Sequence, residues 1–411
     1  MSKETHRVRG LIVSALTGIL LLAACGGGGG LAPATPTGPA ANVQSVVVDG
    51  GPAALASSPD VDTLFTTVTI CAPGSTTNCQ TIDHIQVDTG SSGLRILGSV
   101  LTLSLPVRTD SGGNAVLECV QFLDGFSWGP VATADVQIGG ESASSVPVQV
   151  IGDAAYQTVP SACSSTGPSE DTVKTFGANG ILGVGPFIQD CGSGCATVVS
   201  NGFYYSCVTS TNCSQTTIEV SQQVTNPAAL FATDNNGVII ELPAIGASGA
   251  ATVTGSLVFG IGTQSNNGLG SATVYTVDPG NGSLTTSYNG SSLTDSFIDS
   301  GSNALYFPDN SIPVCSSSST APGFFCPTST LDLSARIQGV NGTSVNVNFQ
   351  IANAVNLFST NAAIAAVSNL GAPNSDSTSF DWGLPFYFGR NIYTAFEQRN
   401  TSGGQGPYFA F

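Results

Sequence analysis

Apolar β-forming residues recur along the chain in short runs, most of which alternate with polar residues. Four segments show this pattern most clearly: 61–70 (VDTLFTTVTI), 134–140 (ADVQIGG), 237–243 (GVIIELP) and 252–261 (TVTGSLVFGI). Alternation with a period of two places one set of side chains on the buried face of a sheet, so each segment predicts a strand. Helical patterns are few, and the best short candidates are 351–355 and the alanine-rich 361–370.

The composition agrees with an all-β chain. Glycine contributes 50 of the 411 residues and charged residues only 9%, which is poor material for helices and suits strands joined by many turns. A hydrophobic share of 41% can bury a large core, in one large domain or two lobes. The net charge is −17, and no basic cluster follows the N-terminus, which excludes a nucleic acid partner.

The N-terminal residues have the features of an export signal. A basic start at residues 3–9 precedes an apolar run at 11–22, which is shorter than a typical membrane span. The run ends in LAAC at positions 22–25, and this segment resembles the bacterial lipobox. The resemblance implies that a signal peptide of residues 1–24 is removed and that Cys25 is diacylated. The alternative is an ordinary signal peptide with a chance cysteine.

The segment after Cys25 has the composition of a tether. Residues 25–43 begin with a glycine run and continue into a proline-rich stretch, which is flexible at first and then stiffer. Gly26 stands where the retention signal of the inner membrane usually has aspartate, so we expect a protein of the bacterial cell envelope anchored through the lipid on Cys25, in the outer rather than the inner membrane.

The cysteine count indicates an oxidising compartment. Of eleven cysteines, ten remain beside the lipidated one, which suits five disulfides. The pairs Cys71/Cys79 and Cys315/Cys326 have the spacing of local bridges. Four more cysteines can pair among themselves in three ways, and the sequence does not choose among them; these are Cys191, Cys195, Cys207 and Cys213.

Histidine is too scarce for most metal and nucleophile chemistry. After signal removal His84 is the only histidine, and no paired C-x-x-C spacing occurs, so we expect no metal site and no cofactor. His84 and Asp88 lie on one predicted strand, roughly 13 Å apart along it, which disfavours a Ser-His-Asp site. We therefore interpret His84 as a residue of the sheet without a chemical role.

Carboxylate chemistry remains, and the chain offers it twice. The segment 87–96 (VDTGSSGLRI) recurs in outline at 298–307 (IDSGSNALYF). In each copy a strand delivers an aspartate into a tight loop, where glycine permits the turn and neighbouring hydroxyls can bond the carboxylate. Two copies 211 residues apart, one in each half, indicate a pair of related lobes that contribute one carboxylate each.

These motifs resemble those of the pepsin-like aspartic peptidases. Asp88 opens the N-lobe motif and Asp299 an accepted form of the C-lobe motif, and the family's apolar-apolar-Gly element matches 180–185 (GILGVG). The segments 382–386 (WGLPF) and 390–397 (RNIYTAFE) resemble the family's closing stretch, with about two extra residues between them, and 255–260 (GSLVFG) resembles the strand that opens family C-lobes. The resemblance implies an all-β, bilobal fold with a central cleft.

The resemblance also implies a mechanism. Two adjacent carboxylates share one proton, so that the ionised one acts as base toward a water and the other polarises the scissile carbonyl. The residues expected to support the dyad are Thr89, Gly90, Ser91, Ser300, Gly301 and Ser302. Ser91 and Ser302 match positions that hydrogen-bond the carboxylates in the family. Because such bonds favour the ionised form and hold pKa values down, the hypothesis includes an acidic optimum.

The expected flap departs from the family pattern. Counting back from 136–140 (VQIGG), the position of the flap tyrosine falls on Phe122, while Gly125 and Gly129 fall where the hairpin needs glycine. Arg95 occupies the position, seven residues after Asp88, where the family usually has the tryptophan that bonds this tyrosine. The loss of both the tyrosine and the tryptophan indicates that the contact which holds the flap is changed. We place Phe122, Gly125 and Arg95 at the flap and substrate cleft.

Two functions of different classes follow. The first is an envelope-anchored, monomeric aspartic endopeptidase that acts on peptides or proteins; the second is a catalytically weak or inactive pepsin-fold lipoprotein that binds a peptide or envelope ligand. The two Asp motifs favour the first, and Phe122 with Arg95 favours the second. A third, weaker interpretation is a structural lipoprotein whose Asp loops brace two lobes. We expect an N-terminal lobe at 44–228 and a C-terminal lobe at 229–411.

Overall fold

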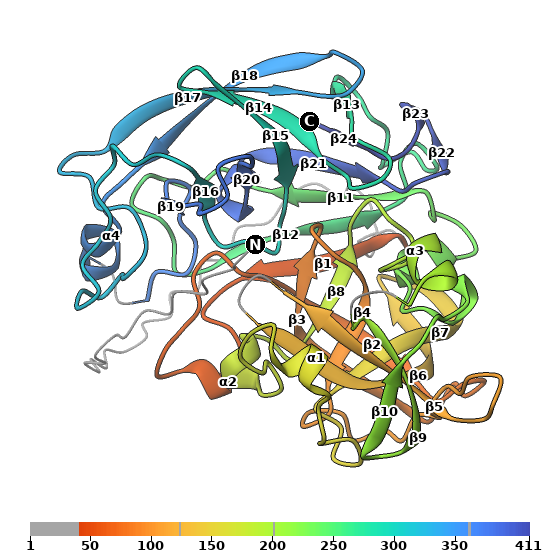
Figure 1. Cartoon of the computed structure of the whole chain (residues 1–411). Helices are drawn as coiled ribbons and strands as arrows, with labels where there is room; N and C mark the ends of the chain where they lie inside the picture. The colour runs from red at the N-terminus through yellow and green to blue at the C-terminus, as the bar shows by residue number, and fades with distance from the viewer. Residues whose placement is uncertain (1–40, 123–124, 200–201, 361–362) are drawn as a thin grey trace, which may run out of the picture.

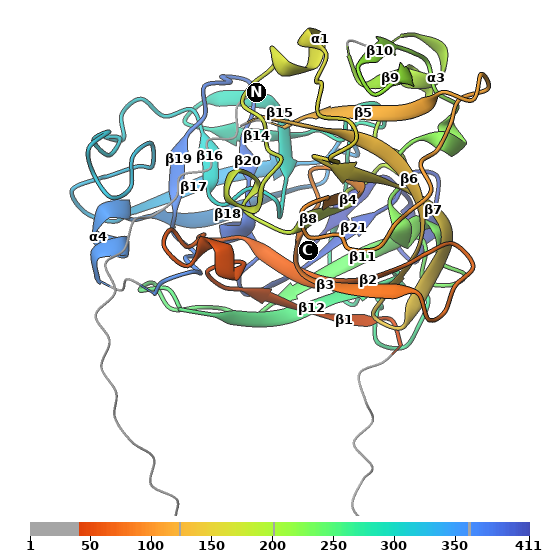
Figure 2. The ribbon, with the colours of Figure 1, turned by 90° about the horizontal axis from the view of Figure 1, so that it is seen from below.

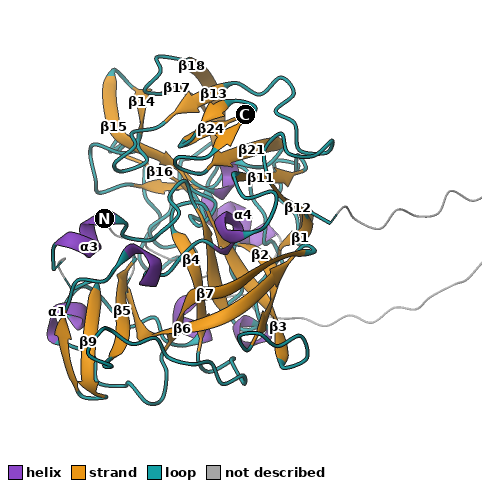
Figure 3. Cartoon of the chain, turned by 90° about the vertical axis from the view of Figure 1, so that its right-hand side faces the viewer, coloured by secondary structure: helices purple, strands orange, loops and turns teal. Residues whose placement is uncertain are grey.

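The protein is described here by a computed structural model that covers residues 41–122, 125–199, 202–360 and 363–411. Strands dominate these ranges (Figures 1 and 3), as expected of an all-β chain. The predicted signal peptide, Cys25 and most of the tether lie outside the described residues. Among those described, no helix is both long and apolar enough to cross a membrane.

The largest sheet has fifteen strands within the described ranges and runs through both halves of the chain. Its strands, in spatial order, are β10 (Asn212–Gln215), β9 (Tyr204–Thr209), β5 (Ala115–Gln121), β6 (Phe126–Ile138), β7 (Glu141–Ile151), β4 (Ser92–Leu97), β8 (Gly180–Val184), β3 (Cys79–Asp88), β2 (Leu64–Cys71), β1 (Val43–Val48), β12 (Val253–Phe259), β11 (Gly237–Leu242), β21 (Arg390–Ala395), β24 (Tyr408–Ala410) and β13 (Val274–Thr276).

A second sheet is built from the C-terminal half. Its order is β18 (Ser344–Ile351), β17 (Leu331–Gln338), β14 (Leu284–Tyr288), β15 (Ser291–Ile298), β20 (Asp381–Trp382), β16 (Leu305–Phe307) and β19 (Gly371–Pro373), and a small hairpin pairs β22 (Asn400–Thr401) with β23 (Gly404–Gln405). The strands predicted at 61–70, 134–140, 237–243 and 252–261 are confirmed as β2, the end of β6, β11 and β12.

Helices are short, and the two predicted ones are misplaced. The helices are α1 (Ser161–Ser164), α2 (Val173–Phe176), α3 (Ser193–Thr197) and α4 (Ala354–Thr360), with 3₁₀ turns η1 (Ala53–Leu55), η2 (Val220–Gln222), η3 (Pro227–Leu230) and η4 (Leu384–Phe386). The prediction at 351–355 overlaps α4 only at Ala354 and Val355, because β18 continues to Ile351. The prediction at 361–370 is wrong over its described part, since 363–370 carries no helix. Backbone pairing explains the second miss, because Ala366 forms a bridge with Ala250.

The two halves of the chain are joined by strand pairing. The six residues of β1 pair antiparallel with β12, from Val43 opposite Val258 to Val48 opposite Val253. The turned view in Figure 2 shows these strands side by side along one edge of the molecule. The predicted lobe boundary at 228/229 falls within η3 and stays a prediction.

Five disulfides reinforce the fold, and multiple disulfides are typical of proteins outside the cytoplasm. The predicted pairs Cys71–Cys79 and Cys315–Cys326 are confirmed. The four cysteines left open pair as close neighbours in sequence, 191 with 195 and 207 with 213. The fifth bridge, Cys119–Cys163, links β5 to α1 across 44 residues.

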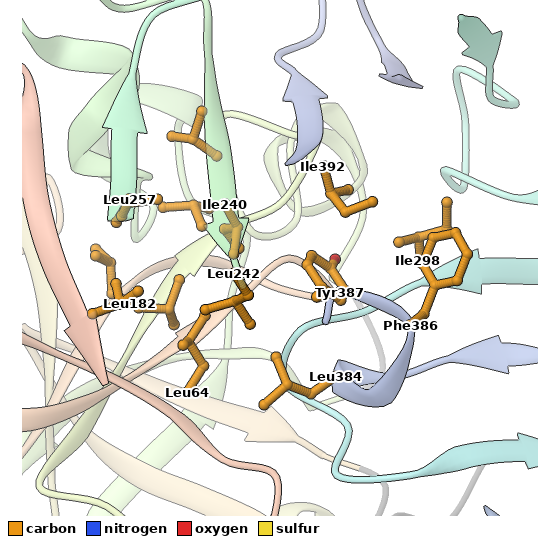
Figure 4. Close-up of a cluster of buried hydrophobic side chains, with 14 of the residues drawn as sticks. Leu64, Leu182, Ile240, Leu242, Leu257, Ile298, Leu384, Phe386, Tyr387 and Ile392 are labelled. Atoms are coloured by element: carbon orange, nitrogen blue, oxygen red, sulfur yellow. The ribbon is translucent and has the colours of Figure 1, made fainter. Parts of the chain in front are cut away.

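A continuous apolar core fills the space between the sheets. Figure 4 shows its centre, to which Leu182 of the N-terminal half and Leu242 and Leu384 of the C-terminal half all contribute. The cluster draws on both sheets and buries most of its members completely. Burial of this apolar surface is the main force that holds the Asp-bearing strands in place.

Asp62 makes a buried polar contact between segments that are distant in the sequence. Its side chain is fully buried, its N–H donates to Ala365 O (2.7 Å), and its Oδ1 accepts from Val367 N–H (2.7 Å). Among the described residues, Oδ2 has no hydrogen-bond partner. Burial raises the pKa of Asp62 well above its usual range, although the Val367 N–H lowers it in part.

Asp62→Asn is expected to stabilise the protein at neutral pH. Folded Asp62 holds its proton more tightly than unfolded Asp62, so its contribution to stability is complete at acid pH and is lost as the pH rises through the raised pKa. Asparagine stays neutral and keeps the acceptor for Val367. Urea unfolding should show the variant more stable than wild type at pH 7, with the difference closing toward pH 3. A difference of equal size at both pH values would contradict this account.

Candidate active site

The two Asp loops occupy equivalent places in the two halves. Asp88 is the last residue of β3 and Asp299 follows directly after β15, so each carboxylate stands where a buried strand ends. Both side chains are almost fully buried, with exposed fractions of 1% and 2%. Tight turns of small residues then lead into β4 and β16.

A third strand threads beside each loop, as the motifs predict. β8 lies between β3 and β4, with Gly183 opposite both Asp88 and Gly93. In the other half, β20 lies between β15 and β16, with Trp382 opposite both Ile298 and Leu305. In each case one neighbour is parallel and the other antiparallel. The same local topology therefore surrounds both aspartates.

Thr89 and Ser300 tie the loops to each other. Thr89 N–H donates to Ser300 Oγ (3.1 Å), and Ser300 N–H donates to Thr89 Oγ1 (3.0 Å). Each hydroxyl then donates to the opposite strand, Thr89 to Ile298 O (3.1 Å) and Ser300 to Val87 O (2.8 Å). All four bonds lie in the buried interior, where each buried polar group needs a partner. This reciprocal set fixes the relative position of the two loops.

Each aspartate receives the same two donors from its own loop. Asp88 Oδ1 accepts from Gly90 N–H (2.7 Å) and Oδ2 from Ser91 Oγ (2.5 Å). For Asp299 the corresponding donors are the next glycine N–H (2.7 Å) and Ser302 Oγ (2.8 Å). Hydrogen bonds of this kind favour the ionised form of a carboxylate and hold its orientation.

The two carboxylates converge on the glycines between them. A Cβ added to Gly301 would lie 2.7 Å from Asp88 Cγ and 3.0 Å from Asp299 Oδ1. A Cβ added to Gly90 would lie 2.7 Å from Asp299 Cγ. Each carboxylate therefore packs against the bare backbone of the opposite loop. This arrangement brings together all eight residues that the sequence predicts for the dyad and its support: Asp88, Thr89, Gly90, Ser91, Asp299, Ser300, Gly301 and Ser302.

Tyr387 is a contact of the site that sequence reasoning missed. Its side chain is fully buried within the core of Figure 4, and its hydroxyl lies 2.8 Å from Thr89 Oγ1. Because the Thr89 hydrogen goes to Ile298 O, Tyr387 is the donor in this bond. Burial raises the pKa of Tyr387 well above its usual value, so the hydroxyl stays protonated.

The flap residues of the sequence analysis lie on or beside the β5–β6 hairpin. Phe122 N–H donates to Gly125 O (2.8 Å), and the Phe122 ring packs edge-on against Phe176 of α2 at 5.9 Å. Residues 123–124 at the tip lie outside the described residues. A Cβ added to Gly129 would collide with Val150 O, which explains why a glycine stands at this position.

Arg95 contacts the hairpin in the buried interior, through Glu118 of β5. Its side chain is only 1% exposed, and it forms ion pairs with Glu118 of β5 and with Asp190, each at 2.9 Å. Neither partner could be predicted from the sequence, because Glu118 stands inside an apolar strand pattern and Asp190 lies 95 residues away.

His84 is placed in the sheet, as predicted, at a bulge of β3 with φ 46°. Its ring nitrogens lie 3.4 Å from Asp49 and 3.1 Å from Asp83. Hydrogen bonding to Asp49, opposed by partial burial, raises its pKa. Within the described ranges, no group of three or more His, Cys, Asp and Glu side chains has the arrangement of a metal site.

The comparisons with known proteins show the family of this chain. A family model matches residues 38–411, nearly the whole chain. The chain belongs to the DUF3443 family. That family is described as a protein of unknown function. No curated protein sequence matches this DUF3443 member.

Among solved structures, this DUF3443 protein is similar to an aspartic proteinase from Irpex lacteus. The TM-score is 0.52 at 15% sequence identity, over 90% of this chain and 96% of that chain. An identity this low shows the fold alone, and the fold is that of the pepsin-like aspartic proteinases. The predicted fold class and the resemblance to this family are confirmed.

Proposed function

We propose that this DUF3443 protein is an aspartic endopeptidase that hydrolyses peptide bonds through Asp88 and Asp299. The single observation that carries the proposal is the convergence of the two buried carboxylates on Gly90 and Gly301, each with the same two donors. A fold that only binds has no need of two carboxylates held in this mirrored way.

The proposed reaction uses one ionised and one protonated carboxyl group. The ionised carboxylate takes a proton from a water placed between the two, and the water oxygen attacks the carbonyl carbon of the scissile bond. The protonated carboxyl group gives its proton to the carbonyl oxygen. When the tetrahedral intermediate collapses, one of its hydroxyl groups returns a proton to the carboxylate that gave one up, the C–N bond breaks, and the leaving nitrogen receives the proton taken from the water. The pair of carboxyl groups then again holds one proton. Ser91 and Ser302 keep each carboxylate oriented throughout.

Proteolysis of a peptide library tests this proposal. A soluble form beginning at Gly38, where the family match starts, with its disulfides intact, is incubated from about pH 3 to 7, and the products are identified by mass spectrometry. We expect cleavage that is strongest at acid pH and absent from an Asp88→Asn control. A folded wild type that cuts nothing at any pH would contradict the proposal.

A binding protein of the same fold is the second candidate, and the attachment of the hairpin favours it. The outer edge of β5 pairs with β9, and Cys119 bonds Cys163 of α1. A hairpin held on this side has less freedom to open and close over a substrate. Tight binding of library peptides by both wild type and Asp88→Asn, without cleavage by either, would identify this second function.

We propose that the protein is held in the outer membrane of a bacterial envelope by lipid on Cys25. The LAAC segment and the five disulfides support this location. Detergent phase partitioning of the full chain expressed in a bacterial host tests it. Wild type should enter the detergent phase and Cys25→Ala the aqueous phase; equal partitioning of the two would contradict lipidation.

Tyr387→Phe is expected to reduce the proposed hydrolysis mainly through kcat. The variant keeps the buried ring but removes the hydroxyl that donates to Thr89, so the tie between the loops loses one bond. We expect stability to fall by about 1 kcal/mol and kcat by roughly 10-fold, with KM little changed, in steady-state assays. An unchanged kcat would show that Thr89 needs no such support.

A further inference from the structure

A buried ionic cluster lies between the Asp88 loop and the β5–β6 hairpin. Arg95 stands on β4, the strand that leaves the Asp88 loop, and its Nη2 lies 2.9 Å from Glu118 Oε1 and 2.9 Å from Asp190 Oδ2. The exposed fractions of the three side chains are 1%, 0% and 4%. Two carboxylates therefore face one guanidinium out of contact with water.

The cluster joins three parts of the N-terminal half. Arg95 belongs to the central sheet, and Glu118 belongs to β5, where it pairs with Gly129 of β6 and Tyr204 of β9. Asp190 belongs to the segment that follows β8 and leads to α3. Among the residues described, Arg95 forms ion pairs with these two carboxylates alone. A single guanidinium thus connects β4, the hairpin strand β5 and the inserted segment, in addition to the strand pairing between them.

The charges of the cluster do not balance when both carboxyl groups are ionised. Tyr204 OH donates to Asp190 (2.9 and 3.0 Å) and accepts from Val224 N–H (2.8 Å), so it adds no charge. Among the described residues, Glu118 Oε2 and Arg95 Nε have no hydrogen-bond partner. Burial of a net negative charge is costly, and one added proton makes the cluster neutral.

The titration of Asp190 agrees with this charge count. Burial raises its pKa well above the usual range, the neighbouring Glu118 carboxylate raises it further, and Arg95 and Tyr204 lower it in part. Burial likewise raises the pKa of Tyr204 well above its usual value, so that hydroxyl stays neutral. The pair of carboxyl groups therefore takes up one proton as the pH falls.

We propose that Arg95, Glu118 and Asp190 are positioning residues that fix the β5–β6 hairpin relative to the Asp88 loop, most firmly when the two carboxyl groups share one proton. At higher pH the second carboxylate ionises, repels Glu118 and weakens the attachment of the hairpin. The role of the hairpin in closing over a substrate rests on the proposed endopeptidase function. The pH-dependent attachment of the hairpin does not rest on that function.

Stability measured against pH tests the proton count. The full-length protein is unfolded in urea from pH 4 to 8, together with Glu118→Gln, Asp190→Asn and the control Glu219→Gln, which makes the same charge change at an exposed position. Folded Asp190 binds its proton more tightly than unfolded Asp190, so stability is lost as pH rises. The equilibrium constant for folding should fall more steeply in wild type than in either cluster variant, by up to about tenfold per pH unit.

Two outcomes would overturn the proton count. In the first, wild type and Glu118→Gln have the same slope of stability against pH. In the second, the control Glu219→Gln flattens this slope as much as the cluster variants do. If Glu118→Gln folds poorly, Asp190→Asn tests the same proton uptake independently, because the asparagine amide imitates the protonated acid. Asp62 contributes equally to all four proteins, so differences between slopes remove it.

Amide hydrogen exchange tests the positioning role. Protection factors of peptides from 115–138 are compared with those from the β17–β18 hairpin of the same molecule at pH 5 and 8. We expect the first set to lose protection at pH 8 in wild type, at least about tenfold more than the second, and to lose none in Glu118→Gln. Equal losses in both hairpins would overturn the positioning role. If wild type cleaves no peptide, the proposed function fails, but both measurements still decide on the cluster.

Discussion

Replacing Gly301 by alanine is expected to lower the proposed peptide hydrolysis at least about 100-fold. The added Cβ would lie 2.7 Å from Asp88 Cγ, closer than Cβ atoms approach other atoms in proteins, and 3.0 Å from Asp299 Oδ1, which is a tight contact. Both carboxylates must move apart, and a shift of about 1 Å in catalytic geometry costs about this much in rate. Because the backbone of Gly301 has no positive φ, the loss comes from the carboxylates and not from turn strain.

Steady-state hydrolysis of a library-derived peptide measures this effect. Gly268→Ala is the matched control, since a Cβ there meets nothing within 4 Å and its backbone is also ordinary. The control should keep the wild-type rate. Activity of Gly301→Ala within a few-fold of wild type would mean that the space between the carboxylates is not where the reaction occurs.

The largest loss of stability is expected for Trp382→Ala. The indole is fully buried, it stacks on Phe380 with ring centroids 4.1 Å apart, and its Nε1–H donates to Thr286 Oγ1 (3.0 Å). Truncation of a buried tryptophan leaves a cavity and costs about 3–5 kcal/mol. Because Trp382 O also accepts from Asp299 N–H (3.1 Å), activity should fall as well.

Urea unfolding followed by circular dichroism checks this expectation. Trp382→Phe keeps most of the ring stacking and loses mainly the bond to Thr286, so it should lose no more than about half as much stability. A loss below about 1 kcal/mol for Trp382→Ala, or an equal loss for both variants, would show that the indole does not organise this core.

The Asp loops could be predicted from the sequence because their signals are local. An apolar strand, an aspartate and a glycine at fixed spacing are sufficient to specify such a loop, and the repetition at 88 and 299 indicated a pair. The threaded strands β8 and β20 carried equally local patterns. The resemblance to a known family then supplied the relative arrangement of the lobes, which no local pattern contains.

The contacts that depend on distant residues could not be predicted. In the sequence Arg95 stands out only as a departure from the family pattern. Its partners are brought to it by the pairing of β5 with β9 and by the segment after β8. Tyr387 meets Thr89 across 298 residues. The helix predicted at 361–370 failed for a related reason: alanine has the highest helix propensity, but propensity is a weak determinant of structure, and long-range pairing overrides it.

The most direct test of the central claim asks whether Asp88 and Asp299 act as one unit. Values of kcat/KM are measured at the optimum pH for wild type, Asp88→Asn, Asp299→Asn and the double variant. Residues that act as a unit give non-additive losses, so each single variant should lose as much activity as the double variant, about 1,000-fold or more. Substantial activity in either single variant, or losses that multiply in the double variant, would contradict a shared-proton dyad.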